Sequence, residues 1–356
     1  MPNLTTDMKD LWTYLAGTDK PVVMYGMGNG ADKIIDVLDR YGVTVSDFFA
    51  SDGFVRGHSF HGKRVLSFSE IKEKYQDFII LLSFGTSRRE VLDVIYSLDR
   101  NFELYAPDVP VAGKELFNCE FFTEHKKELE RARDLLADER SKEIFDCMID
   151  YKLTGKISFL RSAVSSKSEV FKDILKVDKC RNYVDAGAYT GDTIRELYSL
   201  GAHPDTITAF EPDPKSFKKL AKYAEEDRKV IPINAGVWSE DTELLFNVEG
   251  NRNSGVSEKG RSVRMVALDS IESAHGADYI KFDVEGSERN ALLGTRGIIR
   301  ESSPSLMVAL YHRSGDIYDL VQLVHDIDPG YKLYIRRFEY VPAWDLNLIA
   351  VKGSEK

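Results

Sequence analysis

Residues 183–193 constrain the fold most. A short apolar run ends in Asp185, and Gly187 and Gly191 follow it. From Ile194 onward, apolar residues recur at three-residue steps, as on one face of a helix. Strand, glycine turn and helix form a βα unit whose backbone N–H groups face a ligand. A second strand, 207–210, ends in Glu211, 24 residues beyond Gly187. A carboxylate at this place can accept hydrogen bonds from ribose hydroxyls. The sequence therefore predicts a nucleoside-containing cofactor, either NAD or S-adenosylmethionine.

A second glycine turn stands near the N-terminus. The apolar strand 21–25 leads into a G-x-G-x-x-A turn and a helix, and Asp52 follows 21 residues after Ala31. With later strands at 78–83 and 102–105, this pattern predicts a small Rossmann-like domain over residues 1–110. Two interpretations stay open: a scaffold, or a nucleotide or sugar-nucleotide site. The residues that would form such a site are Gly26, Gly28, Asn29 and Ser83.

The rest of the chain divides into a helical connector and a second sheet. Residues 111–178 combine dense charge with apolar residues at helical spacing, which predicts helices. Residues 179–356 read as a parallel αβ repeat that closes with two strands, 331–338 and 346–351, around Pro342. A terminal hairpin of this kind is typical of methyltransferase sheets. Another hairpin is expected at 243–248 and 262–268. Its linker, 249–261, is rich in Gly, Asn and Ser, and we expect it to be mobile and to close over the acceptor.

Composition narrows the class of partner. The formal net charge of -10 and the sequence pI of about 5.4 argue against a duplex-binding surface. No apolar run reaches about 18 residues, so no membrane span is expected. The N-terminus lacks the pattern of a signal peptide. Three widely spaced cysteines indicate reduced thiols and a cytoplasmic location. We expect a small-molecule or glycan acceptor, no nucleic acid, and leave the oligomeric state open.

Four ordered motifs resemble the FkbM family of methyltransferases. The resemblance covers about residues 179–356, and one departure from the broader methyltransferase pattern is Tyr189 in place of the middle glycine. The residues that carry it are Asp185-x-Gly187-Ala188-x-x-Gly191-x-Thr193, Phe210-Glu211-Pro212-Asp213-Pro214, Ile280-Lys281-x-Asp283-Val284-Glu285-Gly286-x-Glu288 and Tyr311-His312-Arg313-x-x-Asp316. The implied fold class is α/β, with two Rossmann-like parallel-sheet domains joined by a helical connector. The second is implied to be a seven-stranded methyltransferase fold with a terminal antiparallel hairpin.

The resemblance implies transfer of a methyl group from S-adenosylmethionine, usually to a hydroxyl of a sugar or secondary metabolite. Asp185 and the N–H groups of 187–193 would hold the methionine end, Glu211 the ribose, and residues 234–237 the adenine. The expected cofactor-binding residues are Asp185, Gly187, Ala188, Tyr189, Gly191, Thr193, Glu211, Pro212, Asn234, Val237 and Asp283.

A hydroxyl acceptor is a better nucleophile when a base removes its proton. The candidates are Asp283, Glu285 and His312, which follow the fourth and fifth strands. His312 is favoured as the base because histidine titrates near neutral pH, with Asp283 as the base or an orienting group. Glu285 is expected to cap a helix starting at Gly286, or to contact the acceptor. A divalent cation on Asp283 and Glu285 is a less favoured alternative, and no metal is expected.

Two other functions compete with methyl transfer. A nicotinamide-dependent sugar-modifying enzyme would be expected to carry a Tyr-x-x-x-Lys pair, and no tyrosine in the chain has a lysine four residues later. A non-catalytic nucleotide-binding module would keep the cofactor fold and lose the acidic residues. Asp185, Glu211 and Asp283 are all present.

Overall fold

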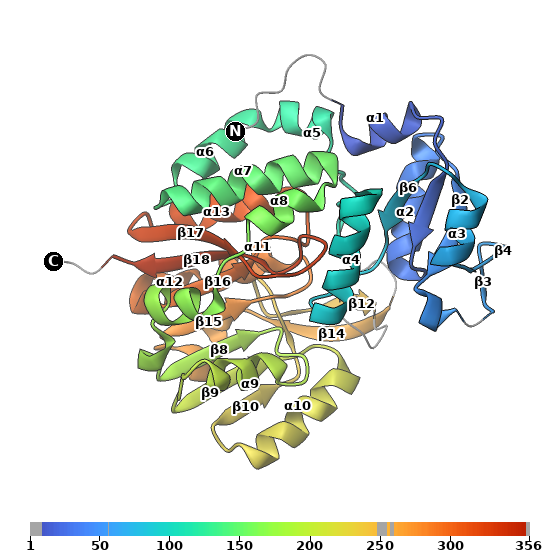
Figure 1. Cartoon of the computed structure of the whole chain (residues 1–356). Helices are drawn as coiled ribbons and strands as arrows, with labels where there is room; N and C mark the ends of the chain where they lie inside the picture. Colours follow the sequence, from blue (N-terminus) through green and yellow to red (C-terminus); the bar gives the residue numbers. More distant parts are fainter. Residues whose placement is uncertain (1–8, 56, 248–254, 257–259, 354–356) are drawn as a thin grey trace.

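The computed structural model describes residues 9–55, 57–247, 255–256 and 260–353. Two separate sheets dominate the chain, and helices pack on both faces of each (Figure 1). The first is a five-stranded parallel sheet with the order β5-β2-β1-β6-β7. Its strands are β1 (Val22–Tyr25), β2 (Val45–Ala50), β5 (Leu66–Ser67), β6 (Ile79–Leu82) and β7 (Glu103–Tyr105). The helices in this part are α1 (Leu11–Ala16), α2 (Asn29–Arg40), α3 (Phe68–Lys74) and α4 (Arg89–Asn101).

The first sheet confirms the predicted Rossmann-like pattern and adds an edge that the sequence did not reveal. Every residue of β1 and β6 is buried, as in parallel sheets covered on both faces. The short edge strand β5 and the helix α3 were not predicted. Asp52 explains them in part: its carboxylate accepts bonds from Phe68 N (2.8 Å) and Ser69 Oγ (2.8 Å) at the start of α3. Asp52 therefore caps the N-terminus of α3, which follows the edge strand β5.

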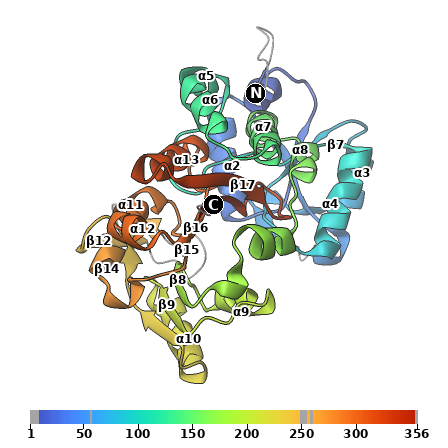
Figure 2. The same ribbon diagram turned by 90° about the vertical axis from the view of Figure 1, so that its left-hand side faces the viewer.

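Helices fill the connector, as expected from its periodicity. They are α5 (Cys119–Glu124), α6 (Lys126–Asp134), α7 (Glu139–Thr154) and α8 (Ile157–Ser162), followed by a π-helical turn at Glu169–Ile174. Helix α7 ends at Gly155, which has the left-handed φ of 65° that glycine adopts at helix ends. Figures 1 and 2 both place α7 beside β17 (Tyr331–Arg337). Ser141 on α7 accepts a hydrogen bond from Ile335 N (3.0 Å), which fastens the connector to the second sheet.

The second sheet has seven strands in the order β10-β9-β8-β15-β16-β18-β17. Its remaining strands are β8 (Asn182–Ala186), β9 (Thr206–Phe210), β10 (Val230–Ile233), β15 (Tyr279–Phe282), β16 (Ser305–Ala309) and β18 (Leu346–Lys352). Strand β18 runs antiparallel to both of its neighbours, which confirms the terminal hairpin. The helices are α9 (Asp192–Ser199), α10 (Pro214–Glu226), α11 (Glu288–Leu293), α12 (Arg296–Ser302) and α13 (Asp316–Ile327). The strand order reverses at β8, and ligands of open α/β sheets bind at such a point.

A small four-stranded sheet stands beside the seven-stranded one. It contains β11 (Gly236–Val237), β12 (Thr242–Asn247), β13 (Gly255–Val256) and β14 (Arg261–Val266). Strands β12 and β14 pair antiparallel, which confirms the second predicted hairpin. The linker 249–261, for which mobility and closure are predicted, lies largely outside the described residues.

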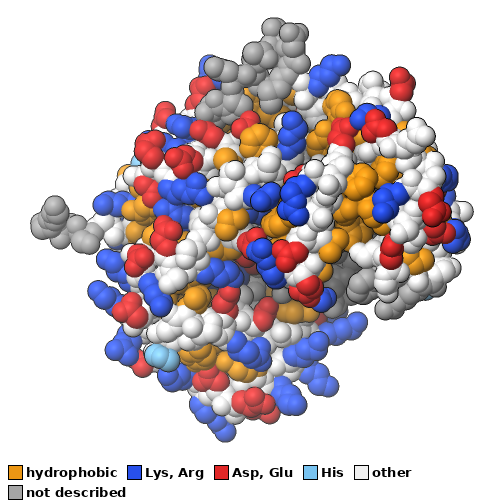
Figure 3. Space-filling model, viewed as in Figure 1, with side chains coloured by type: hydrophobic (Ala, Val, Ile, Leu, Met, Phe, Trp, Pro, Cys, Tyr) orange, Lys and Arg blue, Asp and Glu red, His pale blue; other side chains and the backbone are white. Residues whose placement is uncertain are grey.

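The surface seen in Figure 3 interleaves basic and acidic side chains rather than separating them. This matches the mixed charge of the sequence. Among the described helices, none has the length and apolar content needed to cross a membrane.

Candidate active site

One cavity of about 350 Å³ lies at the carboxyl ends of β8, β9, β15 and β16. Its volume is that of a small-ligand site. The central sheet edge supplies Gly187, Glu211, Asp283 and Tyr311 to its wall. Tyr340 and Trp344, in the turn between β17 and β18, line the same cavity. The carboxylates predicted from different strands are therefore brought to one place.

The turn after β8 is closely packed. Gly187 has a φ of 95°, and a Cβ there would lie 2.0 Å from the carbonyl oxygen of Asp283. Only glycine fits this approach of two strand ends. The prediction that the N–H groups of this turn all face the cofactor needs correction. Gly187 N (3.1 Å) and Ala188 N (2.8 Å) both donate to Phe210 O, and Gly191 N donates to Ala188 O (2.8 Å). These residues shape the turn.

Asp185 lies behind the cavity wall and is fully buried. Thr193, which does line the cavity, donates its hydroxyl to Asp185 Oδ2. Lys281 Nζ lies 4.0 Å from Asp185 Oδ1. Burial raises the pKa of Asp185, and the nearby ammonium opposes this shift. In this structure Asp185 therefore orients Thr193 and Lys281 without reaching the cavity itself.

Glu211 reaches the cavity from the end of β9, and it is only 7% exposed. Burial raises its pKa to about 8, although hydrogen bonds from the backbone of Asp213 and Tyr189 oppose the shift. Asn234, predicted to flank the adenine, donates its side-chain amide to Glu211 O (2.8 Å). It therefore fastens the Glu211 turn, whereas Val237 lines the cavity.

Asp283 carries a dense set of partners at the end of β15. Tyr311 donates its hydroxyl to Oδ1 (3.0 Å), and Lys281 Nζ lies 3.2 Å from Oδ2. Burial alone would raise the pKa of Asp283, but Lys281, His312 and the Tyr311 bond outweigh burial and lower it to about 2. Burial would likewise lower the pKa of Lys281, and its two carboxylate neighbours raise it instead. Asp283 is thus ionised and faces the cavity.

Glu285 stands in the left-handed region with a φ of 54°, ahead of Gly286 at 92°. This conformation costs a non-glycine residue about 1–3 kcal/mol, and such strain collects at functional sites. Glu285, Tyr189 and Asp345 are the cavity-lining residues that share it. The expected helix cap needs correction, because α11 begins at Glu288 with Ser287 as its N-cap. Glu285 instead faces the cavity.

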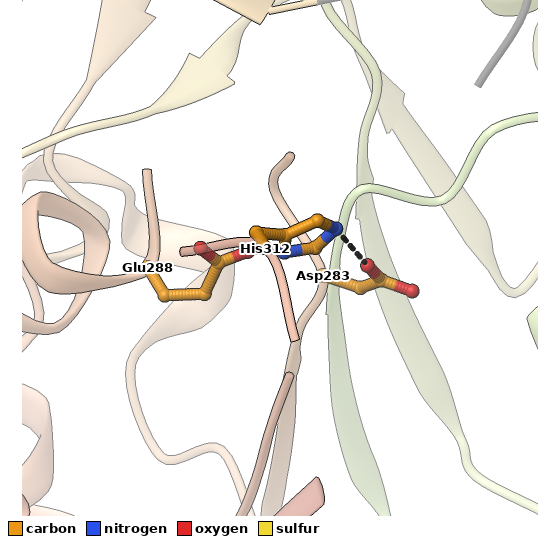
Figure 4. Close-up of side chains that lie close together, drawn as sticks. All are labelled: Asp283, Glu288 and His312. Atoms are coloured by element: carbon orange, nitrogen blue, oxygen red, sulfur yellow. Dashed lines mark ion pairs between the residues drawn. The ribbon is translucent and has the colours of Figure 1, made fainter. Parts of the chain in front are cut away.

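His312 lies between the carboxylates of Asp283 and Glu288, which stand at the two ends of the turn between β15 and α11 (Figure 4). Its Nδ1 is 2.9 Å from Glu288 Oε1, while its Nε2 is 3.5 Å from both Asp283 Oδ1 and Glu285 Oε2. The imidazole is fully buried. Burial would lower its pKa, but the three carboxylates raise it to about 10. The prediction of His312 as the base needs correction: at neutral pH it already holds its proton and does not line the cavity.

The same three side chains raise the question of a metal. Ligand atoms of Asp283, Glu288 and His312 lie within 4.8 Å of one another. However, the two carboxylates face opposite nitrogens of the imidazole. An ion bound to one ring nitrogen would therefore lie on the side of one carboxylate and away from the other. The arrangement suits an ion-paired imidazolium better than a chelate.

Several cavity residues had no predicted role. Lys281 and Tyr311 stood inside quoted motifs, and their position at strand ends was a usable signal. No sequence signal indicated the other three, Ser87, Tyr340 and Trp344, because they reach the cavity from loops. In contrast, Gly26, Gly28 and Asn29 are not among the residues that line the cavity.

The sheet order, with a cavity at its reversal, is that of the Rossmann-type methyltransferase fold. Residues 185–333 match the family model of the Methyltransferase FkbM domain, and this stretch is accordingly an FkbM methyltransferase domain. The structure of methyltransferase FkbM from Methylobacillus flagellatus KT is 18% identical, with a TM-score of 0.71 over 95% of this chain and 92% of that one. The shared fold thus extends through the first sheet.

More distant structures resemble only part of the chain. Fibrillarin from Aeropyrum pernix with natively bound S-adenosyl-L-methionine is 13% identical, with a TM-score of 0.34 over 52% of this chain and 73% of that one. A putative caffeoyl-CoA O-methyltransferase from Staphylococcus aureus is 13% identical, with a TM-score of 0.31 over 66% and 98%. No curated protein matches the chain.

Proposed function

We propose that the protein is an S-adenosylmethionine-dependent O-methyltransferase acting on a hydroxyl of a sugar or secondary metabolite. One observation carries this proposal: a single cavity in the FkbM domain joins the buried carboxylate of Glu211 to the ionised Asp283. The two stand at the ends of β9 and β15, on either side of β8. A cofactor and an acceptor can therefore meet in this cavity.

The cavity suits a ribose-containing cofactor. Burial raises the pKa of Glu211 to about 8, so its carboxylate gains from hydroxyl groups that donate to it. Tyr189 and Thr193 line the cavity on the β8 side, and Pro212 and Val237 line it near Glu211. These residues would hold S-adenosylmethionine, which supplies an electrophilic methyl group when bound.

Asp283 is the group we assign to the acceptor hydroxyl. Its carboxylate stays ionised between Lys281 and Tyr311, so it can accept a hydrogen bond and orient the oxygen. A hydroxyl becomes strongly acidic as its oxygen gains a carbon, so even a weakly basic carboxylate can receive the proton. His312 acts through Asp283 and Glu285 as a positioning residue, because its buried charge faces both carboxylates.

The part of the cavity beside Tyr340 and Trp344, called here its outer part, fits a sugar ring. Tyr340 and Trp344 offer aromatic faces for apolar C–H groups, and Glu285 and Asp345 offer acceptors for hydroxyls. We further infer a small-molecule or glycan acceptor rather than a nucleic acid, because the chain is acidic. A cytoplasmic location remains a proposal from the cysteines.

Calorimetry with S-adenosylmethionine, S-adenosylhomocysteine and NAD side by side tests the cofactor. We expect S-adenosylhomocysteine to bind at micromolar levels and Glu211→Ala to weaken it by about 1–3 kcal/mol. Glu225→Ala, an exposed carboxylate on α10, is the matched control and should change nothing. Binding of NAD without S-adenosylhomocysteine would overturn the proposal. Formation of S-adenosylhomocysteine from S-adenosylmethionine and a panel of methyl glycosides tests the acceptor class.

A further inference from the structure

The first sheet touches the methyltransferase cavity through the loop Phe84–Ser87, which follows β6. Thr86 N donates to Val341 O (2.8 Å), and Val341 N donates back to Thr86 O (3.0 Å). Val341 lies in the turn between β17 and β18, next to Tyr340 and three residues before Trp344. Ser87 itself lines the cavity. One wall of the cavity is therefore built jointly by residues more than 250 positions apart.

Gly85 sets how closely the two parts approach. A Cβ on Gly85 would lie 2.5 Å from Trp344 Cζ3, 2.8 Å from Trp344 Cε3 and 3.0 Å from Tyr340 Cε1. Real side chains do not approach so closely, so even alanine would displace the rings. Both rings line the cavity, so their position affects its shape. Gly85 therefore controls the shape of a site that belongs to the other sheet.

The glycine turn of the first sheet supports this loop. A Cβ on Gly30 would lie 2.2 Å from Ser83 O, and one on Gly26 would lie 2.7 Å from Ser83 Oγ and from Phe84 Cδ1. Ser83 Oγ in turn donates to Tyr25 O (3.0 Å). Gly26 and Gly30 are thus explained by the close packing of the turn after β1 against the end of β6, which sets the place where loop Phe84–Ser87 leaves the sheet. No ligand is needed to account for them.

A second contact joins the first sheet to the cavity wall. Lys33 on α2 donates to Val111 O (2.8 Å) and Pro110 O (3.4 Å), and Val111 lines the cavity. At the far side of the β17–β18 turn, Tyr96 on α4 donates its hydroxyl to Glu339 Oε1 (3.2 Å). The two contacts tie α2 and α4 to different segments of the wall.

We propose that loop Phe84–Ser87 of the first domain is a specificity element of the methyltransferase site, which holds Trp344 and Tyr340 where they select the acceptor. This inference rests on the proposed function, in which the outer part of the cavity receives the acceptor. It assigns the first domain a role in shaping the acceptor site and requires no nucleotide at Gly26, Gly28 or Asn29. The cofactor end, with Glu211 and Thr193, lies outside the contacts of this loop.

The test compares wild-type protein with Gly85→Ala and with Gly53→Ala as a control. Gly53 belongs to the same domain, and a Cβ there would contact nothing within 4 Å. Gly85→Ala should keep S-adenosylhomocysteine affinity within about twofold, since the side chains that its Cβ would meet are Trp344 and Tyr340 and not Glu211 or Thr193. Its kcat/KM for the best methyl glycoside should fall at least about tenfold, and the order of preferred glycosides should change. Gly53→Ala should match wild type in both measurements.

A second readout needs no acceptor. In a Trp12→Phe, Trp238→Phe background, Trp344 is the remaining tryptophan of the three. Acrylamide should quench its fluorescence more strongly when Gly85→Ala displaces the indole, and Gly53→Ala should leave quenching unchanged. Unaltered quenching, or an unaltered glycoside profile, would overturn the proposal. Wild-type protein that fails to bind S-adenosylhomocysteine would contradict the proposed function instead. The quenching result would still show whether Gly85 determines the position of Trp344.

Ser87→Leu guards against a folding artefact. Ser87 is exposed at the cavity, so the larger side chain should be tolerated in the fold. We expect an unchanged melting temperature and S-adenosylhomocysteine affinity, with slower turnover of the larger glycosides. If Ser87→Leu turns over small and large glycosides at the wild-type rates, the loop does not select the acceptor.

Discussion

The imidazole of His312 lies with its Nδ1 2.9 Å from Glu288 Oε1, and both side chains are at most 1% exposed. Glu288 Oε1 also accepts a hydrogen bond from Val284 N (2.8 Å), so this carboxylate ties the turn after β15 to the histidine. The opposite ring nitrogen faces Asp283 and Glu285 at the cavity. A buried cation thus connects a structural carboxylate with two carboxylates that can contact substrate.

His312→Gln should destabilise the fold. It leaves Glu288 buried without its cation, and breaking a buried ion pair costs about 3–5 kcal/mol. Because the pKa of His312 is raised from 6.5 to about 10, its stabilisation is complete below pH 6.5 and is lost as the pH rises through 10. The difference in free energy of unfolding between wild type and variant should shrink over this range by up to about 1.4 kcal/mol per pH unit.

Urea unfolding at pH 6.5, 8 and 9.5 measures this difference. His58→Gln, at an exposed histidine in a loop of the first domain, is the control and should show no such trend. A constant gap between wild type and His312→Gln across the three pH values would mean that the imidazole is not an ion-paired cation.

Affinity for S-adenosylhomocysteine should rise with pH. The pKa of Glu211 is raised to about 8 by burial, so the free protein must lose a proton before the carboxylate can accept two ribose hydroxyls. If the ligand binds only the ionised form, affinity grows by up to about tenfold per pH unit below pH 8 and then levels. Calorimetry from pH 6 to pH 9 follows the trend.

Glu211→Gln provides the comparison for that trend, because it keeps the shape of the side chain and does not titrate. Its affinity should be weaker at pH 9 and nearly independent of pH. If wild type and Glu211→Gln show parallel pH profiles, another group controls binding.

Glu285→Gly should stabilise the protein while harming turnover. Glycine relieves the backbone strain of the left-handed conformation at φ 54°, which is about 1–3 kcal/mol. The greater conformational entropy of glycine in the unfolded chain offsets part of this gain. A net gain of about 1 kcal/mol is expected in urea unfolding. The loss of a cavity carboxylate should lower the rate of S-adenosylhomocysteine formation at least about tenfold, assayed with the best methyl glycoside.

Ser303→Gly is a matched control, because Ser303 has a φ of 51° at the end of α12 and is not a cavity residue. It should give a similar gain in stability at an unchanged rate. If Glu285→Gly proves less stable than wild type, contacts of the Glu285 side chain outweigh its backbone strain.

Local pattern was sufficient for most of the fold. The strands 22–25 and 79–82 are short buried apolar runs, and Gly187 follows strand 182–186 at the turn into a helix. The order of the last strands along the chain also predicted the terminal hairpin, and the resemblance to the FkbM family implied the seven-stranded sheet. Edge strand β5 was missed because two residues carry no periodicity.

Spacing along the chain placed Glu211 and Asp283 in the site, since carboxyl ends of parallel strands share one edge. Spacing could not predict the protonation states of His312 and Glu211. The charge of His312 depends on Glu288, Asp283 and Glu285 around one buried ring, and the pKa of Glu211 depends on its desolvation. Loop Phe84–Ser87 reaches the cavity because Gly85 packs on Trp344 and Thr86 pairs with Val341. These features arise from burial and from contacts between distant segments, and both exist only once the chain has folded.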